Sequence, residues 1–404
     1  MERKLLNKKS SFPKSEITIG GSKSETNRLL ILNQLYGTPL EIKNLSDSED
    51  TQTLRQAFSQ TGNTIDVGHA GTAMRFLTAF FAIQENREII LTGSQRMKQR
   101  PIGILVEALN QTGADITYLE NEGYPPIQIR GKKLNRDFVE LDAGVSSQFV
   151  TALLLIAPSI ENGLTIQLNG NITSLPYLTL SIEWLKKLGI QVEATGNQIK
   201  IHPKRTIEPQ TIWVESDWSS ASYFYSLAAL SEDAKIRLNH FIPNSWQGDS
   251  RVKEIYAKYF GVETRFQGTQ IYLTKKADSL PDSLELNLNG TPDLAPTIAV
   301  TCGGLRMKCK LTGLGTLAIK ETDRLAALRS ELAKIGTIAE TTSDSLEIIG
   351  FKEIQEKPVI HTYDDHRMAM AFAPLCLLMD LEIENPQVTQ KSYPGFWNDL
   401  EKLF

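Results

Sequence analysis

Residues 146–157 read SSQFVTALLLIA, two serines followed directly by an almost wholly apolar run. Serine at such a start typically caps a helix, because its side-chain oxygen accepts a free backbone N–H of the first turn. A run that is apolar nearly all round predicts a buried helix. The same arrangement recurs five times, as SKSETNRLLIL at Ser22, AGTAMRFLTAFFA at Ala70, SSASYFYSLAAL at Ser219, PDLAPTIAVTC at Pro292 and YDDHRMAMAFAPLCLL at Tyr363.

A second element accompanies each of these starts. It is an amphipathic helix that stops at glycine and passes into a β-type segment, as in TLRQAFSQTGNTI, ILVEALNQTGADI, SIEWLKKLGIQV, VKEIYAKYFGVET and ALRSELAKIGTIA, with a sixth copy in FWNDLEKLF. We expect the glycines to be left-handed helix C-caps; they are Gly62, Gly113, Gly189, Gly261 and Gly336. Alternating segments such as REIILTG, LTIQLNG, QIKIHP and SLELNLNG predict strands. The pattern indicates an α/β protein with six repeats in a closed arrangement, three per domain, divided near Trp213 to Asp217.

Composition limits the classes of function. A chain of 404 residues exceeds the usual size of one core, which favours two domains. The formal charge of −4 argues against broad nucleic-acid binding. The three cysteines lack C-x-x-C spacing, which argues against a disulfide framework and against a zinc site. Such cysteines are typical of a protein of the reducing cytoplasm. The first residues lack the apolar stretch of a signal peptide, and the longest apolar run, 149–158, is too short to cross a bilayer.

The repeated helix starts predict anion binding. Each start offers free N–H donors at the positive end of a helix dipole. For any single copy, plain capping is the better interpretation. However, basic residues recur beside the same starts, namely Lys23, Arg28, Arg100 and Arg367. Concentrated positive charge on an acidic chain indicates small substrates that carry phosphate and carboxylate groups.

Seven segments, in order, resemble the signature blocks of the EPSP synthase family: GSKSETNR, HAGTAMR, LTGSQRMKQRPIG, SSQFVTALL, ESDWSSASYF, KETDR and YDDHRMAMAFA. The similarity runs from Gly21 to Pro394. It implies an α/β fold of two similar domains, each with three β-α-β-α-β-β repeats, and an active site in the cleft between them. The expected domains are residues 20–215, mainly for shikimate 3-phosphate, and residues 1–19 with 216–404, mainly for phosphoenolpyruvate.

The resemblance also implies the reaction. Members of the family transfer the enolpyruvyl group of phosphoenolpyruvate to the 5-hydroxyl of shikimate 3-phosphate and release phosphate, through a tetrahedral intermediate. This step of the shikimate pathway serves aromatic amino acid biosynthesis and is the target of glyphosate. By resemblance, Asp293 is the candidate base at the 5-hydroxyl, Glu321 lies near C3 of the enolpyruvyl unit, and Lys23 could protonate the bridging oxygen. His366 completes the expected catalytic set.

The remaining expected contacts are carried over from the same blocks. For shikimate 3-phosphate they are Lys23, Ser24, Arg28, Ser146, Ser147, Gln148, Ser174, Tyr177, Asp293 and Lys320. For phosphoenolpyruvate they are Lys23, Gly71, Thr72, Arg100, Gln148, Arg324, Arg367 and Lys391. Arginine suits such contacts because its planar guanidinium binds a carboxylate or phosphate through two parallel hydrogen bonds.

Each of these residues also has a purely structural interpretation. Glu321 and Arg324 have the spacing of an ordinary helix salt bridge, and Asp293 precedes an apolar run where it could simply cap a helix. Two other functions stay open. A UDP-N-acetylglucosamine enolpyruvyl transferase shares the fold but typically carries a reactive cysteine in its first domain, and here no cysteine precedes Cys302. A non-catalytic, two-domain anion-binding protein would gain nothing from added carboxylates.

Five positions depart from the commoner family pattern and bear on substrate affinity and glyphosate sensitivity: His69, Phe76, Leu175, Trp218 and Thr316. The sequence indicates no metal and no organic cofactor, since the histidines lack ligand spacing and no dinucleotide or P-loop glycine pattern occurs. We expect a soluble cytoplasmic monomer whose partners are the two small substrates, with neither nucleic acid nor membrane among them.

Overall fold

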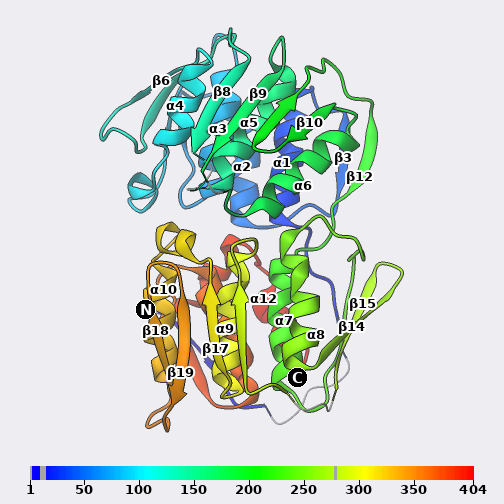
Figure 1. Cartoon of the computed structure of the whole chain (residues 1–404), viewed down its shortest axis with the longest axis vertical. Coiled ribbons are helices and arrows are strands. Elements are labelled where there is room, and N and C mark those ends of the chain that lie inside the picture. The colour runs from blue at the N-terminus through cyan, green and yellow to red at the C-terminus, as the bar shows by residue number, and fades with distance from the viewer. Residues whose placement is uncertain (1, 10–14, 143, 145, 171, 277–279) are drawn as a thin grey trace. The chain divides into compact units, whose positions relative to one another are not determined.

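The computed structural model describes residues 2–9, 15–142, 144, 146–170, 172–276 and 280–404. The chain forms two compact units. The N-terminal unit is the continuous stretch Ser22–Val214, and the C-terminal unit combines Met1–Gly21 with Glu215–Phe404. Each unit is described by itself below, with the labels of Figure 1.

The N-terminal unit alternates helices and strands along the chain. Its helices are α1 (Lys23–Leu35), α2 (Glu49–Ser59), α3 (Gly71–Ala82), α4 (Gly103–Gln111), α5 (Ser147–Ile156) and α6 (Leu175–Lys187), with 3₁₀ turns η1 (Met97–Gln99) and η2 (Ala157–Ser159). Its strands are β3 (Leu40–Lys43), β4 (Thr64–Asp66), β5 (Glu88–Thr92), β6 (Asp115–Tyr118), β7 (Ile127–Arg130), β8 (Phe138–Asp142), β9 (Leu164–Asn169), β10 (Val192–Thr195), β11 (Gln198–Ile201) and β12 (Gln210–Trp213). They pair as the sheets β4-β5-β7-β6, β10-β11-β9-β8 and β12-β3.

The C-terminal unit repeats this alternation. Its helices are α7 (Trp218–Leu230), α8 (Val252–Phe260), α9 (Ala295–Gly304), α10 (Arg324–Lys334), α11 (His366–Phe372) and α12 (Phe396–Glu401), with 3₁₀ turns η3 (Gly248–Arg251), η4 (Pro292–Leu294), η5 (Gly315–Ile319), η6 (Ala373–Leu377) and η7 (Pro386–Lys391). Its strands are β1 (Arg3–Leu6), β2 (Ser15–Ile17), β13 (Lys235–Leu238), β14 (Val262–Gln267), β15 (Gln270–Lys275), β16 (Ser283–Asn287), β17 (Lys308–Thr312), β18 (Thr337–Thr341), β19 (Leu346–Phe351), β20 (Val359–Ile360) and β21 (Leu381–Glu384). They pair as β14-β15-β13-β2, β16-β17-β19-β18 and β1-β21-β20.

The four-stranded sheets share one topology, which confirms the predicted repeat in these sheets. In each four-stranded sheet a parallel pair is extended by two antiparallel strands; β16 and β17, for example, run parallel, and β19 and then β18 follow antiparallel. The chain order β16-α9-β17-α10-β18-β19 is the expected β-α-β-α-β-β unit. The third sheet of the C-terminal unit closes with the start of the chain, since β1 pairs antiparallel with β21.

The predicted helix starts are confirmed, with local adjustments. Ser22 and Ser146 cap α1 and α5, because their side chains accept from the N–H groups of Glu25 and Gln148. Helix α7 starts one residue earlier than predicted and is capped by Asp217, whose carboxylate accepts from the Ser220 N–H. The last predicted run divides into α11 and the 3₁₀ turn η6, which contains Pro374, a residue that cannot donate the helical hydrogen bond.

Four of the five predicted glycine C-caps are left-handed. Gly113, Gly189, Gly261 and Gly336 have φ between 65° and 100°. The prediction is wrong for Gly62. Helix α2 ends at Ser59 with an extended Gln60, so Gly62 lies beyond the cap and needs no left-handed conformation.

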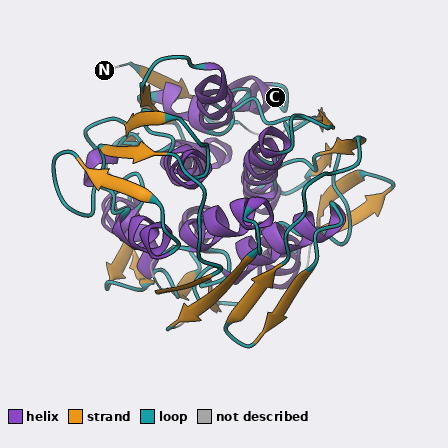
Figure 2. Cartoon of the chain, turned by 90° about the horizontal axis from the view of Figure 1, so that it is seen from above, coloured by secondary structure: helices purple, strands orange, loops and turns teal. Residues whose placement is uncertain are grey.

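In the view of Figure 2 the strands lie mostly around the helices. Every residue of α11 is buried, and so is nearly all of α7. Trp218, one of the departures from the family pattern, is fully buried and packs edge-on against Phe241 at 4.7 Å. Its indole N–H donates to Glu215 at 2.6 Å, so this large residue is a satisfied member of the core.

Candidate active site

Lys23 opens helix α1 in the N-terminal unit. Its ammonium lies 3.0 Å from a carboxylate oxygen of Asp50, in the first turn of α2. The Lys23 side chain keeps 19% of its surface exposed, whereas that of Asp50 keeps only 5%. A partly exposed ammonium, held in place by a buried carboxylate, is available to an anionic ligand.

Arg28 is buried and satisfied within the protein. Its Nε donates to Ser181 at 2.8 Å, Nη1 donates to the Ser24 carbonyl at 2.7 Å, and Nη2 donates to the Tyr177 carbonyl at 3.1 Å. Burial lowers the pKa of the guanidinium to about 10. Because this value is still well above 7, the group is charged at neutral pH. The guanidinium carbon of Arg28 lies 5.7 Å from the centre of the Phe76 ring, a cation–π contact. Arg28 thus joins α1 to α6. Phe76, one of the departures from the family pattern, packs its aromatic face against this cation.

Gly71, the first residue of α3, lies against Arg100. A Cβ added at Gly71 would stand 2.6 Å from Arg100 Nη1 and 2.9 Å from Nη2. Arg100 follows η1 and is 8% exposed. The missing side chain lets a guanidinium lie beside the N–H groups of a helix start, which together favour an anion.

The other expected residues of this unit lie at the starts of α3, α5 and α6. The Gln148 side-chain amide donates to Thr72 Oγ1 at 3.2 Å, which joins α5 to α3. Ser147 and Gln148 begin α5, directly after Ser146. Ser174 precedes α6 with a left-handed backbone, φ 54°, and Tyr177 lies in the first turn of that helix. Small polar groups thus accompany the cations of this unit.

Asp293 lies in η4 of the C-terminal unit between two arginines. Its Oδ1 is 2.9 Å from Arg324 Nη1, and its Oδ2 is 2.9 Å from Arg367 Nη2. Lys320 Nζ is 3.9 Å from Oδ1. Burial raises the pKa of Asp293, but the charges of Arg367, Lys320 and Arg324 outweigh burial and hold this pKa well below its ordinary value. The Asp293 side chain thus pairs with cationic side chains of the protein and does not cap a helix.

Glu321 connects the same arginine to a lysine. Its Oε2 is 2.8 Å from Arg324 Nη2, and its Oε1 is 2.8 Å from Lys391 Nζ. Glu321 and Arg324 form the i,i+3 ion pair that a purely structural interpretation predicts. However, Glu321 lies before the start of α10 and also binds Lys391 in η7. Arg324 is 2% exposed and contacts a third carboxylate, Asp365, at 2.6 Å. Burial lowers the Arg324 pKa, but the three carboxylates raise it above its ordinary value.

His366 begins α11 and is 2% exposed, with its Nδ1 3.6 Å from Asp365 Oδ1. The structure therefore brings together seven of the predicted residues in the C-terminal unit: Asp293, Lys320, Glu321, Arg324, His366, Arg367 and Lys391. The other predicted residues belong to the N-terminal unit.

Asp249 lies beside this cluster but was not among the residues predicted from the sequence. It lies in η3, is 3% exposed, and accepts from the Ser219 hydroxyl, which is 3.5 Å from Arg367 Nη2. Its Oδ1 accepts no hydrogen bond from the residues that the structure describes. Burial and the nearby charge of Asp293 raise the Asp249 pKa to about 6. The only signal in the sequence is an acidic residue shortly before an amphipathic helix, which is indistinguishable from a cap.

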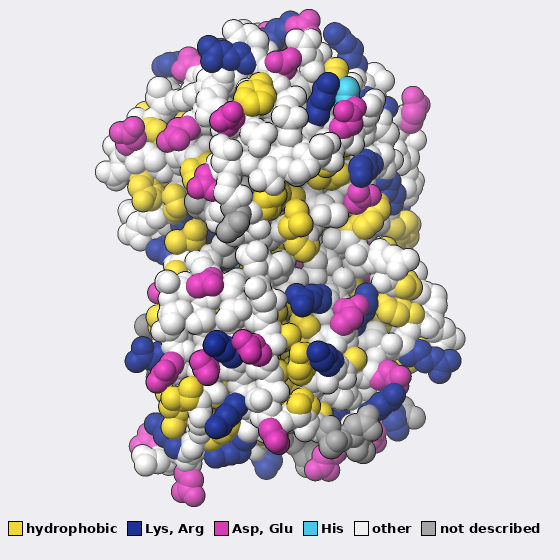
Figure 3. Space-filling view, viewed as in Figure 1, with side chains coloured by type: hydrophobic (Ala, Val, Ile, Leu, Met, Phe, Trp, Pro, Cys, Tyr) yellow, Lys and Arg dark blue, Asp and Glu magenta, His cyan; other side chains and the backbone are white. Residues whose placement is uncertain are grey.

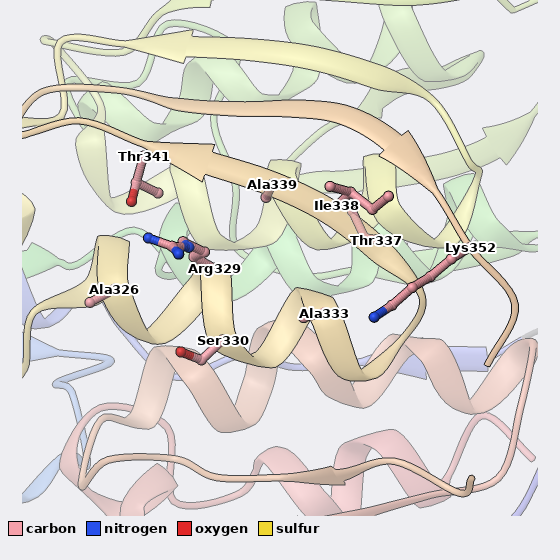
Figure 4. A pocket seen from close by; sticks show the side chains of 9 residues that line it. All are labelled: Ala326, Arg329, Ser330, Ala333, Thr337, Ile338, Ala339, Thr341 and Lys352. Carbon is pink, nitrogen blue, oxygen red and sulfur yellow. The ribbon is translucent and has the colours of Figure 1, made fainter. Parts of the chain in front are cut away.

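One groove described on the C-terminal unit is lined by none of the predicted site residues. This groove follows the exposed side of α10 and strand β18, with Arg329 near Thr341 and Lys352 at the opposite end (Figure 4). Charged side chains of both signs are interspersed on the face shown in Figure 3. Within the described part of the chain there is no cluster of His, Cys, Asp or Glu that could hold a metal ion. None of the helices described is both long and apolar enough to cross a membrane.

Comparison with known proteins identifies the family. The family model described as EPSP synthase (3-phosphoshikimate 1-carboxyvinyltransferase) matches residues 8–67 and 54–400. The chain belongs to the EPSP synthase family. A 3-phosphoshikimate 1-carboxyvinyltransferase of Bacteroides fragilis is 43% identical over 96% of this chain and 95% of its own length. One from Haemophilus influenzae is 36% identical over 96% of both chains.

Solved structures show the same fold at lower identity. EPSP synthase from Acinetobacter baumannii superimposes with a TM-score of 0.73 at 21% identity, over 99% of this chain and 98% of its own. The enolpyruvyl transferase NikO from Streptomyces tendae gives a TM-score of 0.75 at 13% identity, over 100% and 97%. The α/β fold expected of an EPSP synthase is thus confirmed.

Proposed function

We propose that this protein transfers the enolpyruvyl group of phosphoenolpyruvate to the 5-hydroxyl of shikimate 3-phosphate and releases phosphate. The observation that carries the proposal is the cluster in which Asp293 lies between Arg324 and Arg367, in a member of the EPSP synthase family. Buried arginines beside carboxylates supply both the anion binding and the acid–base groups that the reaction needs.

Phosphoenolpyruvate would bind the arginines of the C-terminal unit. Arg324, Arg367 and Lys391 are each 8% exposed or less, and each contacts a carboxylate of the protein. A ligand that carries both a carboxylate and a phosphate can replace these contacts and bind the two arginines through bidentate hydrogen bonds. In the N-terminal unit, Arg100 beside Gly71 is the matching cation.

Binding of the anion would activate Asp293. The surrounding cations now hold its pKa well below the ordinary value, which makes it a weak base. When phosphoenolpyruvate takes hydrogen bonds from Arg324 and Arg367, their effect on Asp293 falls and its pKa rises. Asp293 then accepts the proton of the 5-hydroxyl as that oxygen adds to C2 of phosphoenolpyruvate.

Three further proton transfers complete the reaction. C3 gains a proton to give the tetrahedral intermediate, and the resulting methyl group gives one back as phosphate leaves. Glu321, paired with Arg324 and Lys391, is the proposed group at C3, and Lys23 is the proposed donor to the bridging oxygen. The polar side chains at the starts of α1, α5 and α6 would hold shikimate 3-phosphate, together with Lys320.

Phosphate release by the purified protein tests the function. We expect release only when both substrates are present, and a product with the mass of shikimate 3-phosphate in which an enolpyruvyl group replaces the hydrogen of the 5-hydroxyl. UDP-N-acetylglucosamine in place of shikimate 3-phosphate tests the sister activity, and glyphosate tests competition with phosphoenolpyruvate. Release with the sugar nucleotide alone, or binding of shikimate 3-phosphate without turnover, would contradict the proposal.

We further propose that the enzyme works as a monomer in the cytoplasm. Its three cysteines, Cys302, Cys309 and Cys376, are buried and form no disulfide, which suits a reducing compartment. Gel filtration with light scattering at the concentration of the activity assay tests the oligomeric state. A dimer that carries all of the turnover would contradict this proposal.

A further inference from the structure

The segment before helix α11 holds an unfavourable backbone conformation. Tyr363 and Asp364 are consecutive residues with φ 53° and 56°, in the left-handed region that side chains other than glycine seldom occupy. Such a conformation persists only where surrounding contacts determine it. The next residue, Asp365, is fully buried, caps α11 and binds Arg324.

Glu331 supplies two of the contacts that hold this segment. Its Oε1 accepts from the Tyr363 hydroxyl at 2.8 Å, and its Oε2 accepts from the His361 backbone N–H at 2.9 Å. Burial and the hydrogen bond to Glu331 raise the Tyr363 pKa to about 12, so the hydroxyl stays protonated and donates. Asn385 adds a third contact, since its amide donates to Asp364 Oδ1 at 2.8 Å.

Helix α10 therefore contacts this segment at two points. Arg324, its first residue, binds the Asp365 carboxylate, and Glu331, two turns later, binds the residues just before it. The Asp365 carboxylate also accepts from the Arg367 N–H at 2.9 Å, and Arg367 binds Asp293. The position of both arginines thus depends on how the segment is held.

A simpler role for Glu331 is an i,i+3 ion pair with Lys334, at 2.6 Å. Such pairs usually lie on an exposed helix face and contribute a few tenths of a kcal/mol. Glu331 is instead fully buried, and its oxygens reach residues that are 30 and 32 positions away in the sequence. This geometry favours a role in holding the segment.

We propose that Glu331 is a positioning residue which, through Tyr363 and the His361 backbone, holds residues 361–365 and so aims Arg324 and Arg367 at their anionic substrate. The inference rests on the proposed function for the identity of that substrate, phosphoenolpyruvate. It assigns a role to a residue that would not touch either substrate.

Tyr363→Phe is the decisive variant, because it removes one hydroxyl from a residue that is 42% exposed. We expect KM for phosphoenolpyruvate to rise at least fivefold, while KM for shikimate 3-phosphate stays within twofold. Tyr272→Phe is the matched control, since that hydroxyl donates to Gln270 on β15, in another sheet. Both KM values within twofold in Tyr363→Phe, or equal rises in both, would overturn the proposal.

Two substitutions of Glu331 separate geometry from charge. Gln can keep both hydrogen bonds, because its oxygen accepts from the His361 N–H and its amide donates to the Tyr363 hydroxyl. Glu331→Gln should therefore keep KM for phosphoenolpyruvate within threefold, whereas Glu331→Ala should raise it at least tenfold. Equal effects in the two variants would contradict positioning. If the Ala variant fails to fold, Tyr363→Phe still decides.

Hydrogen exchange makes the inference independent of turnover. The Asp365, Arg367 and Met368 N–H groups donate within this segment. In the ligand-free Tyr363→Phe protein they should exchange at least tenfold faster than in wild type. Unchanged rates overturn the positioning role. A wild-type protein without turnover would instead overturn the proposed function alone.

Discussion

Gly71 and Arg100 lie so close that a single methyl group at residue 71 would stand 2.6 Å from the guanidinium. The atoms in the way are the far end of a flexible side chain, so the fold can adapt, whereas the position of the cation cannot stay unchanged. The contact is therefore a sensitive point for anion binding but not for folding.

Gly71→Ala should raise KM for phosphoenolpyruvate about tenfold, with kcat less affected, because displacement of Arg100 weakens ground-state and transition-state binding alike. Steady-state phosphate release measures both constants. Gly62→Ala is the matched control, since nothing lies within 4 Å of its added Cβ and its φ is not left-handed. Unchanged kinetics in Gly71→Ala would mean that Arg100 does not contact this substrate.

Asp293→Asn should lower kcat by at least about a hundredfold, since general base catalysis typically contributes a factor of 10²–10⁴. The amide keeps the size of the side chain but cannot accept the proton. Single-turnover phosphate release measures the chemical step, and Asp115→Asn, at a position that is 38% exposed, is the control. A kcat within tenfold of wild type would place the base elsewhere.

Arg28→Lys should destabilise the protein by about 2–4 kcal/mol. Lysine cannot reproduce the separate hydrogen bonds to Ser181, Ser24 and Tyr177, which would leave buried acceptors unpaired. Urea unfolding gives the free energy of unfolding. Arg130→Lys, at a side chain that is 50% exposed, should change it by less than about 0.5 kcal/mol. Similar values for the two variants would contradict the role of Arg28 as a buried link.

Asp249 predicts a particular dependence of stability on pH. Its pKa rises from 3.8 to about 6 on folding, so between these values the folded state holds a proton that the unfolded state has released. This group therefore stabilises the folded state at low pH, and that contribution falls by about 3 kcal/mol as pH rises through 6. Asp293 does not oppose the trend, because its lowered pKa matters only below 3.8.

Asp249→Asn should remove this fall. The change in the free energy of unfolding between pH 4.5 and 7.5 should become more positive by about 2 kcal/mol than in wild type, because part of the total effect is already lost below pH 4.5. Chemical unfolding at the two pH values measures it. Asp233→Asn, at a side chain that is 81% exposed, should reproduce the wild-type difference. If the Asp249 carboxyl group instead titrated normally in the folded protein, Asp249→Asn would also show the wild-type difference, which would contradict the prediction.

The repeat and its helix starts were predictable because they depend on local chemistry. Ser22 and Ser146 cap helices for reasons that are visible within four residues of sequence. Gly62 shows the limit of that reasoning, since where α2 ends depends on packing rather than on the glycine. Four strands were equally predictable, since β5, β9, β11 and β16 lie where the alternation placed them.

The candidate site was only partly predictable. The resemblance supplied Asp293, Glu321 and Arg324, and the structure shows that they contact one another. Asp249 and Glu331 were missed, because each acts through a partner at least 30 positions away. Periodicity assigns Glu331 to a helix but cannot predict that a tyrosine from another segment binds it.

The pairing of β1 with β21 has a consequence for synthesis on the ribosome. Arg3 pairs with Glu384, so the third sheet of the C-terminal unit needs residues from both extremes of the sequence. Residues 22–214 are continuous and can fold while the rest is still being made, whereas residues 3–6 must wait for their partner strand. The nascent C-terminal unit thus carries an unpaired strand edge until residues 381–384 have been made, and an unpaired edge is a site of aggregation.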